Sequence, residues 1–253
     1  MPKQLLDFSG KVALVTGGGT GIGQAIAQAF AGQGAKVVIT GRSNADVSLS
    51  RIKDDGGEAI FVRGDVGKAA DVRAVVAAAV DAYGRLDIAV NNAGTGVVGV
   101  PMADQTEEDF DHMIATDLKG VFLCMKYEIP AMLAAGGGSI INVGSVASVI
   151  ADPGMAIYVA AKHGMVGITK GAALDYAKQN IRVNALLPGF TATPMTQNWL
   201  EDPQMVALVS SFNAMGRPAR PEEMVGMALL LASPLASFIT GGVFAVDAGQ
   251  TAH

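Results

Sequence analysis

Residues 11–23 read KVALVTGGGTGIG, an apolar segment that passes directly into a glycine-rich turn. The part at 11–16 is short and rich in β-branched residues, which is typical of a buried strand. The glycines at 17, 21 and 23 allow a sharp turn and remove the side chains that would keep a phosphate away. A helix that begins here directs its free N–H groups toward a bound anion. The segment therefore predicts the dinucleotide-binding turn of a Rossmann unit, with wider spacing than the common G-x-G-x-x-G.

Six further apolar segments alternate with longer Ala-rich stretches along the chain. Together with 11–16, the expected strands are 36–40, 58–63, 86–91, 138–144, 181–187 and 243–247. The expected helices lie near 21–33, 44–56, 68–83, 106–135, 155–178 and 221–232. Strands and helices that alternate at these lengths require right-handed crossovers and a parallel sheet. We predict an α/β fold: a doubly wound, seven-stranded parallel sheet of Rossmann type with helices on both faces.

The composition indicates one domain and excludes several classes of partner. No linker, repeat or low-complexity segment interrupts residues 1–253, but 190–212 lacks a clear period and predicts a binding loop. A net charge of −5 without a basic run argues against nucleic acid as a partner. Cys124 is the only cysteine, so an intrachain disulfide is excluded and a buried side chain is expected. The N-terminal residues lack a signal-peptide core and the longest apolar run holds a proline, which predicts a cytoplasmic protein without a membrane partner.

The ends of the second, third and fourth strands carry candidate cofactor ligands. NAD sites usually offer an acid after the second strand, but this chain reads TGRS, and Arg42 suits the 2′-phosphate of NADP. We expect NADP(H) to be preferred and NAD(H) to be possible, although Arg42 also fits an ordinary surface cation. Asp65 suits either an adenine amino group or the start of a helix. The asparagines of NNAG, 91–94, suit either a lock between strands or a cofactor contact.

The motif YVAAK at 158–162 places Tyr158 and Lys162 on one face of a helix. By itself this spacing favours a surface pair, because a Tyr four residues before a Lys is common by chance. Ser145, however, ends the fifth strand, at the sheet edge where ligands bind, thirteen residues before Tyr158. A strand end and the helix that follows it can therefore aim Ser145, Tyr158 and Lys162 at one point. A phenol has an ordinary pKa of about 10, and a nearby ammonium favours its ionised form.

These motifs together resemble the short-chain dehydrogenase/reductase family, in its short, single-domain form. The similarity runs from KVALVTGGGTGIG through NNAG, YVAAK and PGFTATPM to SFITGGVFAVDAG. It implies a single dinucleotide-binding and catalytic domain that transfers hydride between NAD(P) and an alcohol or ketone. Tyr158 would be the acid/base, Lys162 its tuner and ribose ligand, and Ser145 the donor that polarises the carbonyl. The expected cofactor-binding residues are Gly17, Gly19, Thr20, Gly21, Ile22, Gly23, Arg42, Asp65, Val66, Asn91, Ala93, Gly94, Tyr158, Lys162, Pro188, Gly189, Thr191 and Thr193.

One residue departs from the family pattern and is a further candidate catalytic residue. Before LKGVF the family usually carries an asparagine that helps to hold a water relay to the lysine, whereas this chain has Asp117. In one interpretation a backbone carbonyl holds the water and the side chain is neutral to the reaction. In the other, the carboxylate lies one water from Lys162 and changes the electrostatics of both Lys162 and Tyr158.

The remaining expectations concern substrate, assembly and alternatives. A mainly apolar pocket is predicted from Val97, Val146, Ile150, Met155, Phe190, Trp199 and their neighbours in 95–101 and 199–212. Such a pocket suits a hydrophobic ketone or a cyclic secondary alcohol. A 3-oxoacyl-acyl-carrier-protein reductase is the alternative enzyme, and a non-catalytic NADP-binding redox sensor is the alternative of another class. The histidines at 112, 163 and 253 show no metal-ligand pattern. Glycines 164, 167 and 171 and the apolar segment 238–246 resemble the interfaces of family tetramers, which predicts a homotetramer.

Overall fold

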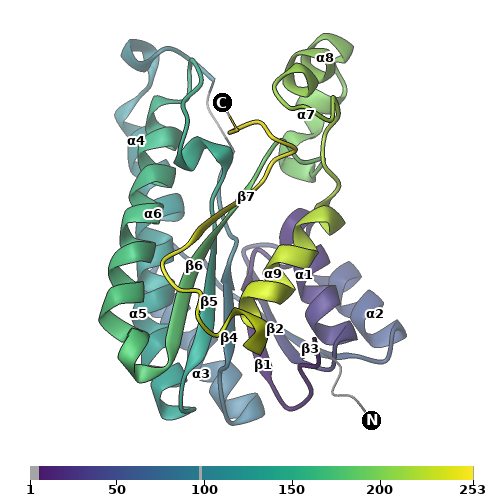
Figure 1. Ribbon diagram of the computed structural model, residues 1–253, viewed down its shortest axis with the longest axis vertical. Helices are drawn as coiled ribbons and strands as arrows, with labels where there is room; N and C mark the ends of the chain where they lie inside the picture. Colours follow the sequence, from purple (N-terminus) through teal and green to yellow (C-terminus); the bar gives the residue numbers. More distant parts are fainter. Residues whose placement is uncertain (1–5, 97–98, 253) are drawn as a thin grey trace.

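The computed structural model describes residues 6–96 and 99–252 (Figure 1). Its centre is a parallel sheet with the strand order β3-β2-β1-β4-β5-β6-β7. The strands are β1 Val12–Thr16, β2 Lys36–Gly41, β3 Glu58–Arg63, β4 Ile88–Asn91, β5 Gly138–Val143, β6 Ile181–Pro188 and β7 Val243–Val246. The chain order reverses between β1 and β4, so the sheet has the switch point of a doubly wound fold. The predicted fold class is confirmed.

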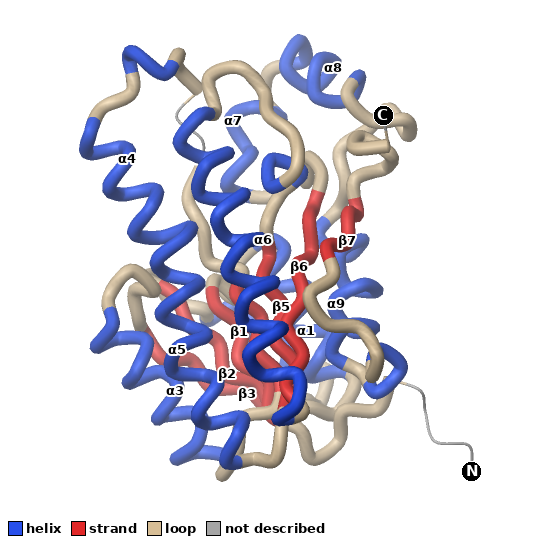
Figure 2. Tube along the Cα trace, turned by 60° about the vertical axis from the view of Figure 1, so that its left-hand side comes forward, coloured by secondary structure: helices blue, strands red, loops and turns tan. Residues whose placement is uncertain are grey.

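Helices cover both faces of the sheet (Figures 1 and 2). On one face lie α1 Gly21–Gly32, α2 Asp46–Asp54 and α9 Val225–Ala232; on the other lie α3 Ala69–Tyr83, α5 Lys119–Ala134 and α6 Ala156–Tyr176. α4 Glu107–Met113 continues toward α5, and the short α7 Gln197–Leu200 and α8 Pro203–Ser211 lie beyond the C-terminal ends of the strands. Short 3-10 turns cover Met102–Asp104, Val146–Ser148, Ala177–Gln179, Pro194–Thr196, Pro221–Met224 and Pro234–Ala236.

The sheet separates two hydrophobic cores. Alternate residues of β1 enter each core: Ala13 and Val15 pack with Ile26 and Phe30 of α1, while Val12 and Leu14 pack on the α3 and α5 side. A strand buried on both faces needs apolar residues at every position, which is why VALVT is continuously apolar. Cys124 is buried beside α3, as expected. Within the described residues, no helix combines the length and apolarity that crossing a membrane requires.

The structure differs from the predicted elements at two places. The helix expected over 106–135 is divided by a π-helical turn at Ile114–Leu118, which adds one residue between α4 and α5. The segment 190–212, expected as a loop, contains α7, α8 and a 3-10 turn. Pro203 stands at the first position of α8, and the Asp202 carboxylate accepts a hydrogen bond from the Gln204 N–H at 2.8 Å. A capping residue followed by proline is a helix-start signal, and here it outweighs the weak hydrophobic period.

Candidate active site

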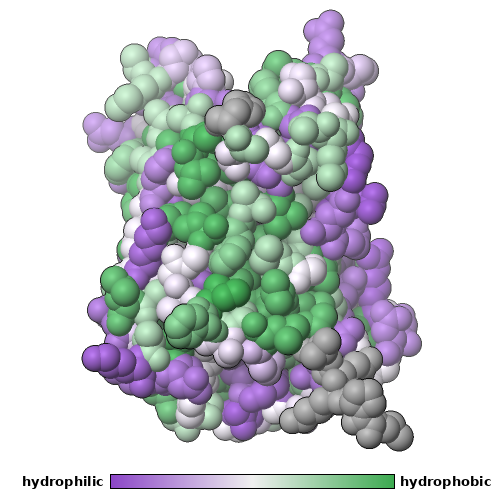
Figure 3. All heavy atoms as spheres, viewed as in Figure 1, coloured by the Kyte–Doolittle hydropathy of each residue, from purple (hydrophilic) through white to green (hydrophobic). Residues whose placement is uncertain are grey.

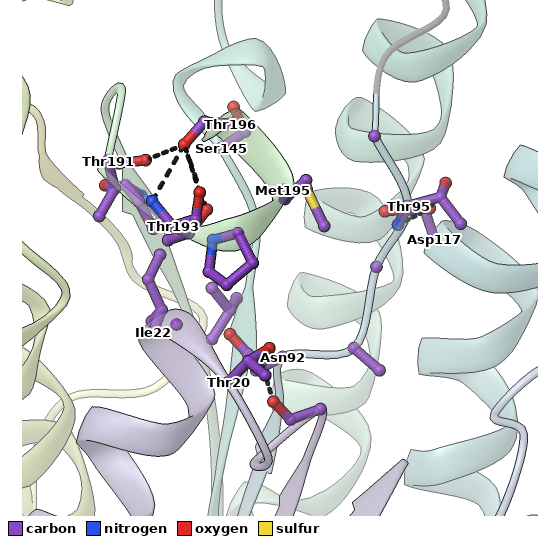
Figure 4. A pocket seen from close by; sticks show the side chains of 18 of the residues that line it. Thr20, Ile22, Asn92, Thr95, Asp117, Ser145, Thr191, Thr193, Met195 and Thr196 are labelled. Carbon is purple, nitrogen blue, oxygen red and sulfur yellow. Dashed lines mark hydrogen bonds between the residues drawn. The ribbon is translucent and has the colours of Figure 1, made fainter. Parts of the chain in front are cut away.

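A cavity of about 550 Å³ opens at the C-terminal ends of the strands. It spans the switch point between β1 and β4, where open α/β sheets bind their ligands. The turn after β1 lines one part of it, and the segment after β6 lines another. Figure 4 shows Thr20 and Asn92 near the glycine turn, with Thr191, Thr193 and Thr196 on one side and Thr95 and Asp117 on the other.

The glycine turn forms a cradle suited to an anion. Gly17 and Gly21 have φ angles of 65° and 55°, which side chains rarely adopt. Thr20 precedes α1 without a side-chain cap, and the first turn of α1 holds no acidic residue. The free N–H groups and positive dipole end of α1 therefore remain available to a bound phosphate.

The expected cofactor residues divide into those that line the cavity and those that do not. Gly17, Gly19, Thr20, Gly21, Ile22, Arg42, Asp65, Val66, Ala93, Gly94, Tyr158, Lys162, Pro188, Gly189, Thr191 and Thr193 line it. Gly23 does not: a Cβ there would collide with the Gly17 carbonyl oxygen and with Asn92, so this glycine allows α1 to pack on the turn. Asn91 does not line the cavity either. Its side chain is buried and donates to Glu128 of α5 at 3.1 Å and to Asn142 of β5 at 2.9 Å.

Asn92 occupies the place in the cavity wall that was expected for Asn91. Its Nδ2 donates to the carbonyl oxygens of Thr16 and Gly17 at 3.0 and 3.3 Å, which ties the glycine turn to the end of β4. Asn91 is the last residue of β4 and points into the interior, whereas the backbone turns toward the cavity one residue later. The NNAG motif indicates that the cavity lies close to these two asparagines. Which of them lines the cavity depends on the direction in which the side chain of the last strand residue points.

Ser145, Tyr158 and Lys162 all line the cavity. Ser145 follows β5 and caps the 3-10 turn Val146–Ser148, where its Oγ accepts from the Ala147 N–H at 3.2 Å. Tyr158 and Lys162 lie one turn apart on α6, with the lysine Nζ 5.4 Å from the centre of the tyrosine ring. The ammonium is therefore close enough to stabilise a phenolate.

Lys162 is buried and makes an ion pair with Asp117 across 2.9 Å. Burial is the largest influence on the pKa of Lys162, and it lowers that pKa. The charge of Asp117, the smaller effect of Tyr158 and a hydrogen bond to Asp117 act in the opposite direction, and together they raise the pKa above its usual value. Lys162 therefore stays protonated at neutral pH. The contact is direct, whereas the sequence had suggested an intervening water.

The substrate side of the cavity combines apolar and polar groups. Val146, Met155, Phe190 and Trp199 line it as expected, and the rings of Phe190 and Trp199 stack 5.7 Å apart at an interplanar angle of 10°. Val97 lies outside the described residues, and Ile150 is not part of the lining.

Sequence reasoning missed Asp152, Met195, Asn198 and Gln250, which also line the cavity. No local sequence pattern marks Gln250 as a cavity residue, because the C-terminal segment reaches the cavity only through the folding of the chain after β7.

No group of three metal-ligating side chains occurs within residues 6–96 and 99–252. The cavity places the phenol of Tyr158 beside the buried ammonium of Lys162 and next to a glycine turn suited to an anion. Two threonines complete the far wall: Thr191 donates to the Gly189 carbonyl at 2.9 Å, and the Thr196 hydroxyl donates to the Thr191 carbonyl at 2.7 Å.

Comparison with known proteins agrees with this geometry. A family model described as Enoyl-(Acyl carrier protein) reductase matches residues 17–251. The chain is 42% identical over 248 residues to a 2,5-dichloro-2,5-cyclohexadiene-1,4-diol dehydrogenase of Sphingobium indicum, covering 97% of this chain and 99% of that protein. It is 39% identical over 251 residues to a cyclohexanol dehydrogenase of an Acinetobacter species, covering 96% of each.

A solved structure shares the fold over nearly all of its length. The crystal structure of a putative 2-deoxy-D-gluconate 3-dehydrogenase from Agrobacterium tumefaciens with bound NADP superimposes with a TM-score of 0.92 at 33% identity, covering 99% of this chain and 100% of that one. The chain is an oxidoreductase and belongs to the short-chain dehydrogenase/reductase family.

Proposed function

We propose that the protein oxidises cyclic secondary alcohols to ketones, and catalyses the reverse reduction, with NADP(H) as preferred cofactor and Tyr158 as acid/base. The observation that carries the proposal is the meeting of Ser145, Tyr158 and Lys162 in a cavity that continues onto the stacked rings of Phe190 and Trp199. A flat apolar wall beside a proton-transfer group suits a ring that bears one reacting hydroxyl. The cyclohexane-type relatives support the same substrate class.

The residues divide the reaction between them. A bound nicotinamide cofactor would supply the hydride chemistry at the carbinol carbon, in either direction. Tyr158 accepts the hydroxyl proton as the carbonyl forms, and Ser145 donates a hydrogen bond to the same oxygen, where negative charge develops. Lys162 stabilises the tyrosine phenolate by its charge. The glycine turn and the start of α1 would hold the pyrophosphate, and the NADP-bound relative supports this fit.

Arg42 supports the preference for NADP(H). It is exposed at the end of β2, lines the cavity, and has no ion-pair or hydrogen-bond partner in the part of the chain that the structure describes. A free guanidinium at this position suits a 2′-phosphate through two parallel hydrogen bonds.

We further propose a homotetramer. Leu174 of α6 is 82% exposed and Phe238 before β7 is fully exposed, and Leu235 lies nearby at 51%. Figure 3 shows apolar surface gathered over the face that carries β7, α6 and α9. An apolar face of this kind on a single subunit is typical of an interface.

A substrate panel tests the function. The wild-type protein would be assayed with NADP⁺ on cyclohexanol and on the open-chain 2-hexanol, and with NADPH on an acetoacetyl thioester, by the absorbance of the reduced nicotinamide. We expect kcat/KM for cyclohexanol to exceed that for 2-hexanol by about tenfold, a difference typical of pocket shape. Preference for the thioester would favour a 3-oxoacyl-acyl-carrier-protein reductase. Tight NADPH binding without turnover of any substrate would favour a redox sensor.

A further inference from the structure

Asp117 is completely buried and touches the lysine that the proposed mechanism relies on. Its Oδ1 lies 2.9 Å from Lys162 Nζ, and the lysine side chain is itself only 5% exposed. Two opposite charges that share so little solvent attract each other strongly, and removing one leaves the other unpaired. The pair is therefore a fixed part of the site.

Thr95 holds the second oxygen of the same carboxylate. Both its backbone N–H and its hydroxyl donate to Asp117 Oδ2, at 3.0 and 2.6 Å. Figure 4 shows the two side chains pointing toward one another at the cavity wall. Each carboxylate oxygen thus has its own partner, Lys162 for Oδ1 and Thr95 for Oδ2, which fixes both the position and the orientation of Asp117.

The backbone around the pair is shaped to accommodate it. A Cβ on Gly94 would lie 2.8 Å from Asp117 Oδ1 and 3.5 Å from Lys162 Nζ, so the ion pair packs directly against a glycine. Asp117 stands in the π-helical turn Ile114–Leu118, and both Asp117 and the preceding Thr116 line the cavity. Such turns recur at functional sites because the extra residue redirects side chains.

We propose that Thr95 and Asp117 are positioning residues that hold Lys162 through a direct ion pair, and that Asp117 partly cancels the field of Lys162 at Tyr158. As a result, alcohol oxidation requires a higher pH than it would if Lys162 had no counter-ion. The inference rests on the proposed acid/base role of Tyr158. The lysine remains the closer charge, so its attraction for the phenolate outweighs the repulsion from Asp117.

The distances set the size of the effect. Lys162 Nζ is 5.4 Å from the Tyr158 ring centre and 2.9 Å from Asp117. For a carboxylate about 8 Å from the reacting group, at an effective dielectric of about 20, removing the carboxylate charge would move the pH profile by about 1.5 units before screening. We expect a shift between about 0.5 and 1.5 units, because solvent and the NADP⁺ charge screen part of the interaction.

The other charged groups around the Asp117–Lys162 ion pair are the same in the wild type and in the variants compared below. Asp152 lines the cavity before α6, while Arg42 and Asp65 lie at the β2 and β3 ends of the sheet. Glu128 of α5 contacts Asn91 rather than Lys162. On α4, Glu107, Glu108, Asp111 and His112 are exposed, and Asp109 is bonded to Thr106.

The first test compares pH profiles of kcat/KM for cyclohexanol oxidation. Asp117→Asn keeps the shape of the side chain and removes its charge, so the rise of kcat/KM with pH should move to lower pH by about 0.5 to 1.5 units. Asp111→Asn, which removes an exposed charge from α4, is the matched control and should leave the profile in place. A superimposable Asp117→Asn profile, or a shift to higher pH, overturns the proposal.

Thr95 gives an independent arm that keeps the ion pair. Thr95→Val removes the hydroxyl donor but retains the backbone donor and the carboxylate. The negative charge of the Asp117 carboxylate is then less neutralised and acts more strongly on Tyr158. The pH profile of kcat/KM should therefore move slightly to higher pH, in the opposite direction to the shift expected for Asp117→Asn. Thr95→Ser restores the hydroxyl and should restore the profile. If Asp117→Asn fails to fold, the two Thr95 variants test the proposal in its place. Equal pH profiles for Thr95→Val and Thr95→Ser would contradict the proposal.

A titration without substrate separates this inference from the proposed function. The ultraviolet absorbance of phenolate, taken as wild type minus Tyr158→Phe, isolates one of the four tyrosines of the chain. The same difference in the Asp117→Asn background should show ionisation at lower pH. If the titration shifts but cyclohexanol is not oxidised, the substrate proposal fails and the inference holds. If cyclohexanol is oxidised but the titration is unchanged, the inference fails.

Discussion

Replacing Glu128 with glutamine should make the protein more stable in alkaline solution. Glu128 is fully buried in α5, where its Oε2 accepts from Asn91 Nδ2 at 3.1 Å. Its Oε1 and the Asn91 Oδ1 have no hydrogen-bond partner among the described residues. Burial raises the pKa of Glu128 from 4.5 to about 8, and the bond from Asn91 only partly opposes this. The carboxyl is therefore neutral in the folded protein at neutral pH.

The sign of the pH dependence follows from the raised pKa. Between pH 4.5 and about 8 the folded protein holds this proton and the unfolded chain does not. The resulting stabilisation is full below pH 4.5 and is lost as the pH rises through 8. The slope is about 1.4 kcal/mol per pH unit, so the wild type should lose about 3 kcal/mol from this group between about pH 6 and pH 9.

The glutamine variant removes the titration and keeps the shape. Its amide is neutral at every pH, its oxygen can accept from Asn91 as Oε2 does, and its NH₂ supplies a donor where the neutral acid carries its O–H. The variant should therefore gain stability relative to the wild type as the pH rises, whatever their difference at pH 6.

Equilibrium urea unfolding measures the effect. Both proteins would be unfolded at several values between about pH 6 and pH 9, at equal subunit concentrations so that association affects both alike. The free-energy difference should change by about 3 kcal/mol in favour of Glu128→Gln. Glu108→Gln, at an exposed position of α4, controls for loss of a surface carboxylate. Parallel curves would show that Glu128 does not hold a proton in the folded state, and the reasoning would be wrong.

Three further outcomes are expected from the proposed function. Tyr158→Phe should lower kcat by at least about 10²-fold because the acid/base is lost; fluorescence titration should show cofactor binding retained, and near-wild-type turnover would end the mechanism. Arg42→Ala should weaken NADPH binding by about 10- to 100-fold, as for loss of hydrogen bonds to a charged group, and leave NADH nearly unchanged; calorimetric titration checks this, and equal effects on both cofactors would contradict it. Light scattering at micromolar concentration should give the mass of four subunits, and a monomer mass would refute the tetramer.

The sheet and the placement of Ser145, Tyr158 and Lys162 at one cavity were predictable because each depends on a local pattern. The central strands β1, β4, β5 and β6 are buried on both faces, so their apolar runs stand out from the Ala-rich helices around them. Ser145, Tyr158 and Lys162 follow in turn from one strand end and one helix face, and a short connection brings these to the same cavity wall. No long-range information is needed for that step.

The contact between Asp117 and Lys162 was not predictable in the same way. The run 106–135 holds no glycine before Gly120 and no proline before Pro130, so nothing local announces the π-helical turn that carries Asp117 into the cavity. One added residue rotates all later side chains by about 100° relative to an unbroken helix. Which of Asn91 and Asn92 lines the cavity was unpredictable for a related reason, because it depends on the direction of the backbone after β4.

Trp199 gives the molecule a built-in optical reporter. It is the only tryptophan in the chain, and its ring stacks on Phe190 at the cavity wall. Light that excites indole selectively therefore samples one position, without the averaging over many emitters that complicates most proteins of this size. Reduced nicotinamide absorbs where indole emits, so a bound reduced cofactor would quench Trp199 by energy transfer. Binding and release could then be followed in real time on the unlabelled protein.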